Sequence, residues 1–243
     1  MKRVSCCSLL AAAAFAAFVA ATNSFAAPAS KPVEEKLEPP TAEQFAISEN
    51  NLKQIGLGIH NFASTNNNAL PTNVYSKDKK PLLSWRVQLL PHLEQEELYK
   101  KFKLDEPWDS DNNKKLIDTM PKIYAPIRVK AVKGMTFYQG FMDSNGVMMA
   151  DRFEIGNIPD GTSNTFAVAE SAKPVIWTKP SDIEFDGKNM PALGGMFEGK
   201  FHGLLYDGSV NRYRKGLRAD LLSRLIDPAD GQVVNPEKED YDK

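Results

Sequence analysis

The chain has 243 residues, of which 42% are hydrophobic and 25% are charged. These proportions are typical of a globular protein and exclude a disordered or fibrous chain. The formal net charge is −1, with 30 basic and 31 acidic residues, which excludes a strongly basic nucleic-acid-binding surface as the main feature.

The N-terminus has the pattern of an export signal. Lys2 and Arg3 precede an apolar, alanine-rich run over residues 9–21, and Ser24-Phe25-Ala26 places small residues at a cleavage site. This pattern predicts a secretory signal peptide over residues 1–26. The alternative is a transmembrane anchor, but the apolar run is shorter than the roughly 20 residues that span a bilayer.

Cleavage of the signal peptide would also remove every cysteine from the exported protein. We expect a periplasmic or extracellular protein that begins at Ala27 and has no stable membrane anchor after cleavage. Both cysteines, Cys6 and Cys7, lie in the removed segment, so the exported chain would contain no disulfide and no thiolate metal site. Four prolines predict an extended linker over residues 27–40.

A single globular domain is expected over residues 41–230, followed by a polar tail over residues 231–243. Its first helix begins with a capping box formed by Thr41 and Gln44 and ends at the three asparagines 66–68. An apolar stripe at helical spacing predicts that one face of this helix packs on the core. The stripe consists of Phe45, Leu52, Ile55, Ile59 and Phe62, and Ile47 and Leu57 are expected to widen it.

Shorter helices and then strands are predicted along the rest of the chain. Helices are expected over residues 84–102 with a break near Pro91, from an N-cap at Asp109 to about residue 119, and over residues 217–226. The apolar period then changes to 2, which predicts strands. Candidate strands cover residues 127–131, 136–141, 153–158, 165–170 and 175–178, and a hairpin joins residues 202–206 to 209–213 through a type I′ turn at Asp207-Gly208.

This order of elements predicts an α+β fold. Helices followed by strands, without regular alternation, favour an antiparallel sheet with the amphipathic N-terminal helix packed on it.

The polar stretch 160–165 is the main candidate site. One interpretation is a structural turn, in which the Asp160 carboxylate accepts hydrogen bonds from the N–H groups that follow it and Gly161 has a positive φ. The other is a loop that presents polar groups to a small solute or a glycan, with an aromatic ring and a cation supplied by the next strand. The candidate ligand-binding residues are Asp160, Thr162, Ser163, Asn164, Trp177 and Lys179.

Catalytic and metal sites have little support in the sequence. The three histidines form no zinc-binding motif, and the acidic run at 109–113 lacks the glycine and glutamate that an EF-hand requires. A hydrolase remains an alternative, because a catalytic triad assembles in space from distant residues. Its members would come from His202, Asp207, Ser163 and Ser209, but no nucleophile-elbow motif is present. We therefore expect no catalytic residue, no metal and no cofactor.

Several long stretches resemble the bacterial domain-of-unknown-function family 1559, which is also catalogued as a solute-binding family. They are SENNLKQIGLGIHNF (48–62), LLSWRVQLLPHLEQEELYKKFKLDEPWDSDNNKKLI (82–117), MPKIY (120–124), IPDGTSNTFAVAE (158–170), VIWTKPSDIEF (175–185) and LLYDGSV (204–210). The resemblance covers nearly all of residues 45–230. Because many members look like type IV pilins or type II secretion pseudopilins, it implies a pilin-like head.

The chain departs from the pilin-like members at two places. A signal peptide and the proline linker stand where those members have a membrane-embedded half-helix, so the resemblance does not imply polymerisation into a fibre. Relatives also often have a histidine ten residues before the Asp of a terminal Asp-Gly, where this chain has Phe197. His202 is out of that register, and the resemblance transfers no catalytic residue.

Three functional hypotheses follow, of which the first is favoured. The first is an exported, non-enzymatic, pilin-like domain that acts in extracytoplasmic assembly or protein interaction, with an unknown protein partner. The second is a binding protein for a small solute or glycan, which would use the 160–165 loop. The third is the hydrolase.

Overall fold

The computed structural model describes residues 38–129, 133–146, 148–232 and 234. The predicted signal peptide, most of the linker and nearly all of the polar tail lie outside these residues. In the part of the chain that the structure describes, no helix is both long and apolar enough to cross a membrane.

The longest element is helix α1 (Ala42–Thr65), which begins as predicted. The Thr41 side chain accepts a hydrogen bond from the Gln44 N–H, and the Gln44 side chain accepts one from the Thr41 N–H, so the capping box is confirmed. Four of the five stripe residues are buried, and Phe62 is partly buried. Ile47 and Leu57 were expected to widen this buried face, but they are 42% and 57% exposed.

The main sheet is antiparallel and has the strand order β3-β5-β7-β8. Its strands are β3 (Met135–Gln139), β5 (Phe166–Ile176), β7 (Lys200–Leu205) and β8 (Val210–Arg214). Two small sheets pair β1 (Val74–Tyr75) with β2 (Pro81–Leu83), and β4 (Phe141–Met142) with β6 (Ile183–Glu184). The predicted α+β class is confirmed.

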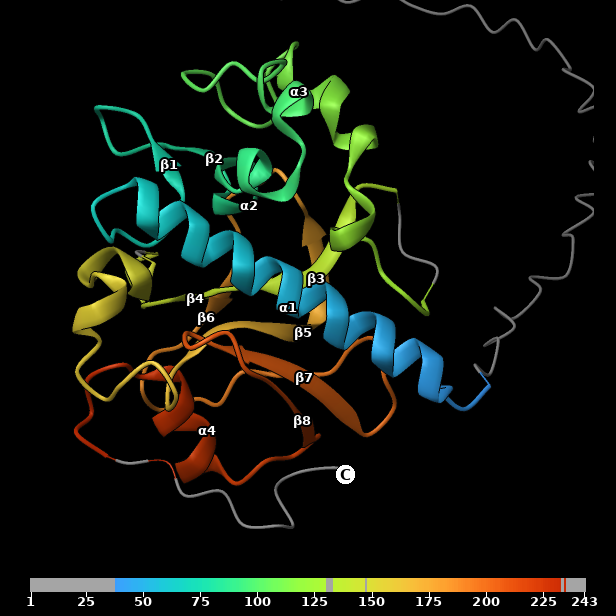
Figure 1. Cartoon of the computed structure of the whole chain (residues 1–243), viewed down its shortest axis with the longest axis vertical. Helices are drawn as coiled ribbons and strands as arrows, with labels where there is room; N and C mark the ends of the chain where they lie inside the picture. Colours follow the sequence, from blue (N-terminus) through green and yellow to red (C-terminus); the bar gives the residue numbers. More distant parts are fainter. Residues whose placement is uncertain (1–37, 130–132, 147, 233, 235–243) are drawn as a thin grey trace, which may run out of the picture. The chain divides into compact units, whose positions relative to one another are not determined.

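Helix α1 lies across β7 and β8 (Figure 1), as expected for the N-terminal helix. Alternate residues of β7 serve opposite faces of the sheet, because side chains alternate along a strand. Leu204 packs in the core with the buried face of α1, whereas Phe201 and Leu205 pack with α4 (Ala219–Ile226). A β-carbon on Gly56 would approach Leu204 Cδ1 to 2.9 Å, which explains the glycine in mid-helix.

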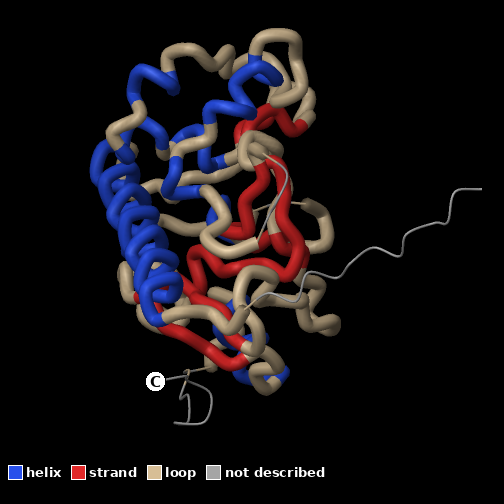
Figure 2. Tube along the Cα trace, turned by 90° about the vertical axis from the view of Figure 1, so that its right-hand side faces the viewer, coloured by secondary structure: helices blue, strands red, loops and turns tan. Residues whose placement is uncertain are grey.

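Short helices follow α1 along the chain. The predicted helix over 84–102 is divided into three pieces, with the proline at the break: α2 (Trp85–Gln88), η1 (Leu90–Leu93) and α3 (Glu96–Tyr99). Helices α2 and α3 lie above α1 in Figure 1, and Figure 2 shows helical segments along one side and toward the top of the molecule. Further 3₁₀ turns are η2 (Asn113–Thr119), η3 (Lys122–Tyr124), η4 (Met149–Arg152) and η5 (Ile155–Asn157).

Some predicted boundaries are wrong. Asp109 does not cap the third helix, because η2 starts at Asn113 and the Ser110 hydroxyl accepts the Asn113 N–H. Residues 153–158 contain the turn η5 instead of a strand, and residues 127–129 form no strand. The predicted strands 165–170 and 175–178 belong to the single long strand β5, which is interrupted by a bulge opposite β3.

The hairpin between β7 and β8 is present, but its turn differs from the predicted type. Gly208 has a φ of +86°, whereas Asp207 does not have a positive φ. The Gly208 N–H donates to the Leu205 carbonyl and the Leu205 N–H donates to the Ser209 carbonyl. This three-residue loop needs a left-handed residue only at its last position, where the glycine stands.

A buried ion pair fixes the short helices to the sheets. Arg86 Nη2 donates to the Asp182 carboxylate over 2.7 Å, and both side chains are fully buried. Trp85 Nε1 and the Gly140 N–H donate to the same carboxylate oxygen. Arg86 Nε also donates to the Tyr138 carbonyl. Since the side chains of Arg86 and Asp182 are fully buried, this network orders the interior.

Candidate functional site

The 160–165 loop is held by contacts within the fold. The Asp160 carboxylate accepts the backbone N–H groups of Asp230 and Gly231, at 2.8 and 3.0 Å. The predicted acceptance from the N–H groups that follow Asp160 is therefore wrong, since this carboxylate ties the loop to a segment 70 residues later. Gly161 has the predicted positive φ, at +89°.

The other polar groups of the loop close it on itself and on the hairpin. Asn164 Nδ2 donates to the Asp160 carbonyl, and the Thr165 hydroxyl donates to the Gly161 carbonyl. The Thr162 carbonyl accepts the Asp207 N–H. Ser163 is exposed. Most of the donors and acceptors that a ligand would need are thus already used.

The aromatic and cationic candidates lie in other environments. The Trp177 side chain is fully buried, stacks near Tyr124 and donates its indole N–H to the Ile117 carbonyl. Lys179 lies over the ring of Trp108, 5.4 Å from its centre. Among the described residues, no hydrogen bond or ring contact connects Trp177 or Lys179 with the 160–165 loop, so the structure does not assemble the six candidates into one site.

A polar cluster that the sequence did not reveal lies beneath α1. The Glu170 carboxylate accepts hydrogen bonds from the Ser48 hydroxyl, the His202 N–H and His202 Nδ1, at 2.5, 2.9 and 3.0 Å. The Tyr138 hydroxyl contacts Ser48 Oγ at 2.7 Å. Burial and the nearby Glu170 charge raise the pKa of Tyr138, so its hydroxyl stays protonated and donates. The sequence feature that could have indicated this cluster is Glu170 itself, a single carboxylate directly after the apolar run 166–169.

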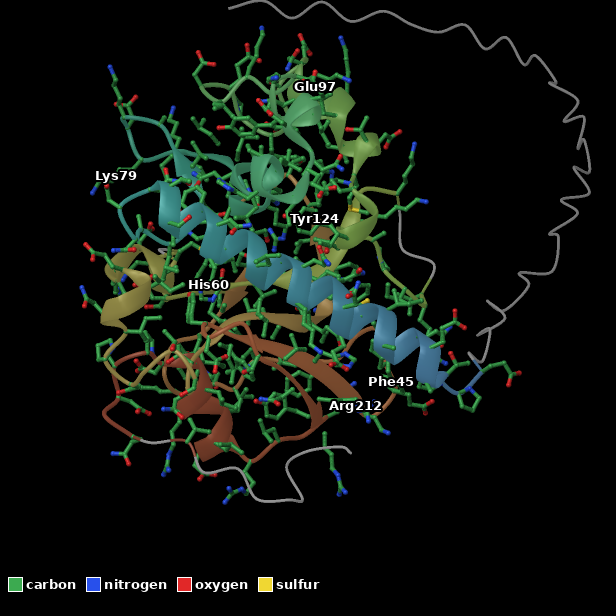
Figure 3. All side chains as sticks on the ribbon, in the orientation of Figure 1. Phe45, His60, Lys79, Glu97, Tyr124 and Arg212 are labelled. Atoms are coloured by element: carbon green, nitrogen blue, oxygen red, sulfur yellow. The ribbon has the colours of Figure 1, made fainter. Side chains whose placement is uncertain are left out.

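Aromatic rings close this cluster off from solvent. Phe45 and Phe197 both meet the His202 ring edge-on and stack on each other with centroids 4.6 Å apart. Arg212 lies over the outer face of Phe45, as Figure 3 shows for the two labelled residues. The side chain of His202 is 1% exposed, and its Nε2 has no hydrogen-bond partner among the described residues.

The cluster does not have the geometry of a hydrolase. In a catalytic triad the histidine contacts the nucleophile and the carboxylate orients the histidine. Here the carboxylate lies between the two: Ser48 and His202 each bond to Glu170, and no hydrogen bond joins Ser48 to His202 among the described residues. The partners proposed from the sequence are also not assembled, because Asp207 accepts from Ser209 and His202 pairs with Glu170.

The outward face of α1 has a different character. Seven exposed residues at alternating spacings of four and three form a line along it, which we name the outward stripe: Glu43, Ile47, Asn50, Gln54, Leu57, Asn61 and Ser64. No member from position 47 to position 64 is charged. Ile47 and Leu57 are two of the three large hydrophobic residues that are exposed in the described part of the chain.

A groove accompanies the outward stripe. One part of it, with a volume of about 870 Å³, lies between α1 and the residues of η1 and η3, and its lining includes Leu57, Asn61, His92 and Lys122. A second part of about 500 Å³ continues along α1 past Ile47. The two parts share Gln54, Lys122 and Ile123, so they form one continuous groove.

Comparison with known proteins gives a match over part of the chain. A family model described as a protein of unknown function (DUF1559) matches residues 46–131, and the resemblance inferred from the sequence is confirmed over this segment. The matched segment contains every residue that lines the groove, whereas the 160–165 loop and the Glu170 cluster partners on β5 and β7 lie beyond it. No curated protein and no solved structure matches the chain.

Proposed function

We propose that this protein is an exported, non-enzymatic domain with a pilin-like head, and that it binds another protein through the outward stripe of α1. The observation that carries the proposal is that the stripe is exposed and that none of its members from position 47 to position 64 is charged. Exposed helix faces usually carry charged residues, whereas the centres of protein interfaces are depleted of charge.

The neighbouring groove supports a protein partner more than a small solute. It is long and open, and its walls combine apolar side chains with the amides of Gln54, Asn61 and Gln95 and the charged groups of Glu94 and Lys122. Amide groups supply both donors and acceptors, which suits the polar groups of another polypeptide. A small-molecule site is typically a more enclosed, mostly apolar cavity.

Two further features support the remaining parts of the proposal. A long N-terminal helix lying across an antiparallel sheet is the arrangement expected of a pilin-like head. The pattern of residues 2–26 supports export.

N-terminal sequencing of the purified product should find Ala27 as the first residue. Retention of Met1 in a membrane fraction would contradict export.

Photo-cross-linking in the producing cells tests the interaction. We expect p-benzoylphenylalanine at position 57 to give adducts heavier than the chain after irradiation. The matched control is Leu104, which is also exposed, at 39%, but neither belongs to α1 nor lines the groove. If position 57 yields no adduct beyond those at position 104, the outward stripe is not an interaction surface.

A further inference from the structure

We propose that the protein bound by the outward stripe is a second copy of this chain, whose α1 lies antiparallel to the first about a two-fold axis that crosses the outward face of α1 at the level of residue 52. The inference rests on the proposed function and adds the identity and orientation of the partner. It is carried by the order of residues along the stripe.

The stripe has the spacing of a helix-pairing seam. Its members follow one another at intervals of four, three, four, three, four and three residues, from Glu43 to Ser64. This heptad spacing keeps one line of side chains facing a neighbouring helix. All seven residues are exposed, so the seam is not used by the fold itself.

The stripe is also self-complementary about its centre. In the antiparallel arrangement, residues at equal distances from position 52 face each other. Ile47 then meets Leu57 of the second copy, and Asn50 meets Gln54 of the second copy, and the two-fold axis repeats both pairs. Apolar side chains therefore face apolar ones, and amides face amides. A two-fold interface requires a surface that is complementary to itself, and this pattern meets that requirement.

Charge selects the antiparallel orientation over the parallel one. In a parallel, in-register pair the carboxylates of the two Glu43 side chains would face each other, which is unfavourable. In the antiparallel pair each Glu43 instead meets the amide of Asn61, which can donate a hydrogen bond. Antiparallel packing also places the positive end of each helix dipole beside the negative end of the other.

The charged residues beside the stripe are compatible with this pairing. Lys53 and Glu49 form an ion pair within α1, with Nζ and Oε1 2.6 Å apart. The hydrogen bond from Lys53 lowers the pKa of Glu49, so the carboxylate remains charged. Near the two-fold axis the two copies would bring together two lysines and two glutamates, with no net charge.

A two-fold pairing closes after two copies and does not continue into a fibre. The expected assembly is thus a dimer, and contact through a single helix from each copy predicts an association that depends on concentration.

Disulfide trapping tests the register. The full chain carrying Cys6→Ser and Cys7→Ser has no thiol, so an introduced cysteine is unique. Chains with Ile47→Cys and chains with Leu57→Cys, distinguished by a mass tag, are mixed and mildly oxidised. We expect the mixed disulfide to exceed either homodisulfide by at least about tenfold. Two copies of position 57 lie about 15 Å apart along antiparallel helices, too far for a disulfide.

Sedimentation equilibrium provides a measurement without cysteines. We expect Leu57→Glu to raise the dissociation constant of the dimer about tenfold or more, because the substitution removes two symmetric apolar contacts. The matched Leu104→Glu should change it less than about twofold.

Each alternative outcome is informative. Homodisulfides of Leu57→Cys that match the mixed product would indicate parallel helices and overturn the antiparallel pairing. A chain that stays monomeric at all concentrations and gives no disulfide would overturn self-association. In that case the proposed function still stands if the cross-linker at position 57 captures a different protein, and it fails if nothing is captured.

Discussion

Glu170 is a buried residue whose hydrogen bonds hold three elements of the interior together. It is a fully buried carboxylate, and it connects α1, β5 and β7 through hydrogen bonds to Ser48 and His202. A buried charge is costly unless hydrogen bonds compensate it. The three bonds that Glu170 accepts provide this compensation and at the same time fix the position of α1 on the sheet.

Replacing Glu170 tests this role. Glu170→Ala should lower the free energy of unfolding by about 3 kcal/mol, because it leaves buried donors on Ser48 and His202 without an acceptor. The exposed Glu184 offers a matched control, and Glu184→Ala should cost less than about 0.5 kcal/mol. Urea melts measure both values. Equal unfolding midpoints for the two variants would show that the cluster does not stabilise the fold.

Asp160 has a comparable role at the surface. Asp160→Ala should destabilise the protein by about 1–3 kcal/mol, since the N–H groups of Asp230 and Gly231 lose their acceptor. Ser163→Ala should be nearly neutral, because its exposed hydroxyl can bond to water. If Asp160→Ala unfolds at the wild-type urea concentration, the loop is not a structural tie, and a ligand-binding role for it gains support.

The pairing of Glu170 with His202 was beyond the reach of the sequence. The two residues are 32 positions apart, and their contact depends on the register of β5 against β7, which a bulge shifts near residue 167. The same limit applies to Asp160, whose partners follow 70 residues later. Local patterns predict turns from adjacent residues, and here the carboxylate is used by a distant segment instead.

At the scale of elements, α1 was the most predictable part of the fold. Its capping box and its buried stripe are local signals, and the structure confirms both. The two apolar residues outside the stripe were misassigned to the core, because hydrophobicity alone does not distinguish a residue that packs inside from one that faces a partner. The 3₁₀ turns were also missed, since a short turn such as η5 has an apolar pattern similar to that of a strand.

The core face of α1 can be tested separately from its outward face. Ile59 is 4% exposed, so Ile59→Ala should cost about 2–5 kcal/mol. Lys53→Ala should cost less than about 0.5 kcal/mol, because its ion pair with Glu49 is on the surface. Small and equal effects on the unfolding midpoint would contradict the packing of α1 on the sheet.

At the scale of the whole molecule, the two faces of α1 have different characters. The inward face contributes to the core and to the Glu170 cluster, and the outward stripe, uncharged from position 47 to position 64, lies next to a groove. The segment matched by the DUF1559 family model contains α1 from residue 46 onward together with the opposite wall of the groove. One side of a single helix therefore packs in the fold, and binding is proposed for the other.

The most direct test of this assignment is the recovery of formaldehyde-cross-linked complexes from cells that produce the Leu57→Glu chain, measured together with its unfolding midpoint. The account predicts an unchanged midpoint, because Leu57 is exposed, and a loss of most of the complexes formed by the wild-type chain. Complexes that persist at the wild-type level in a normally folded Leu57→Glu chain would contradict it.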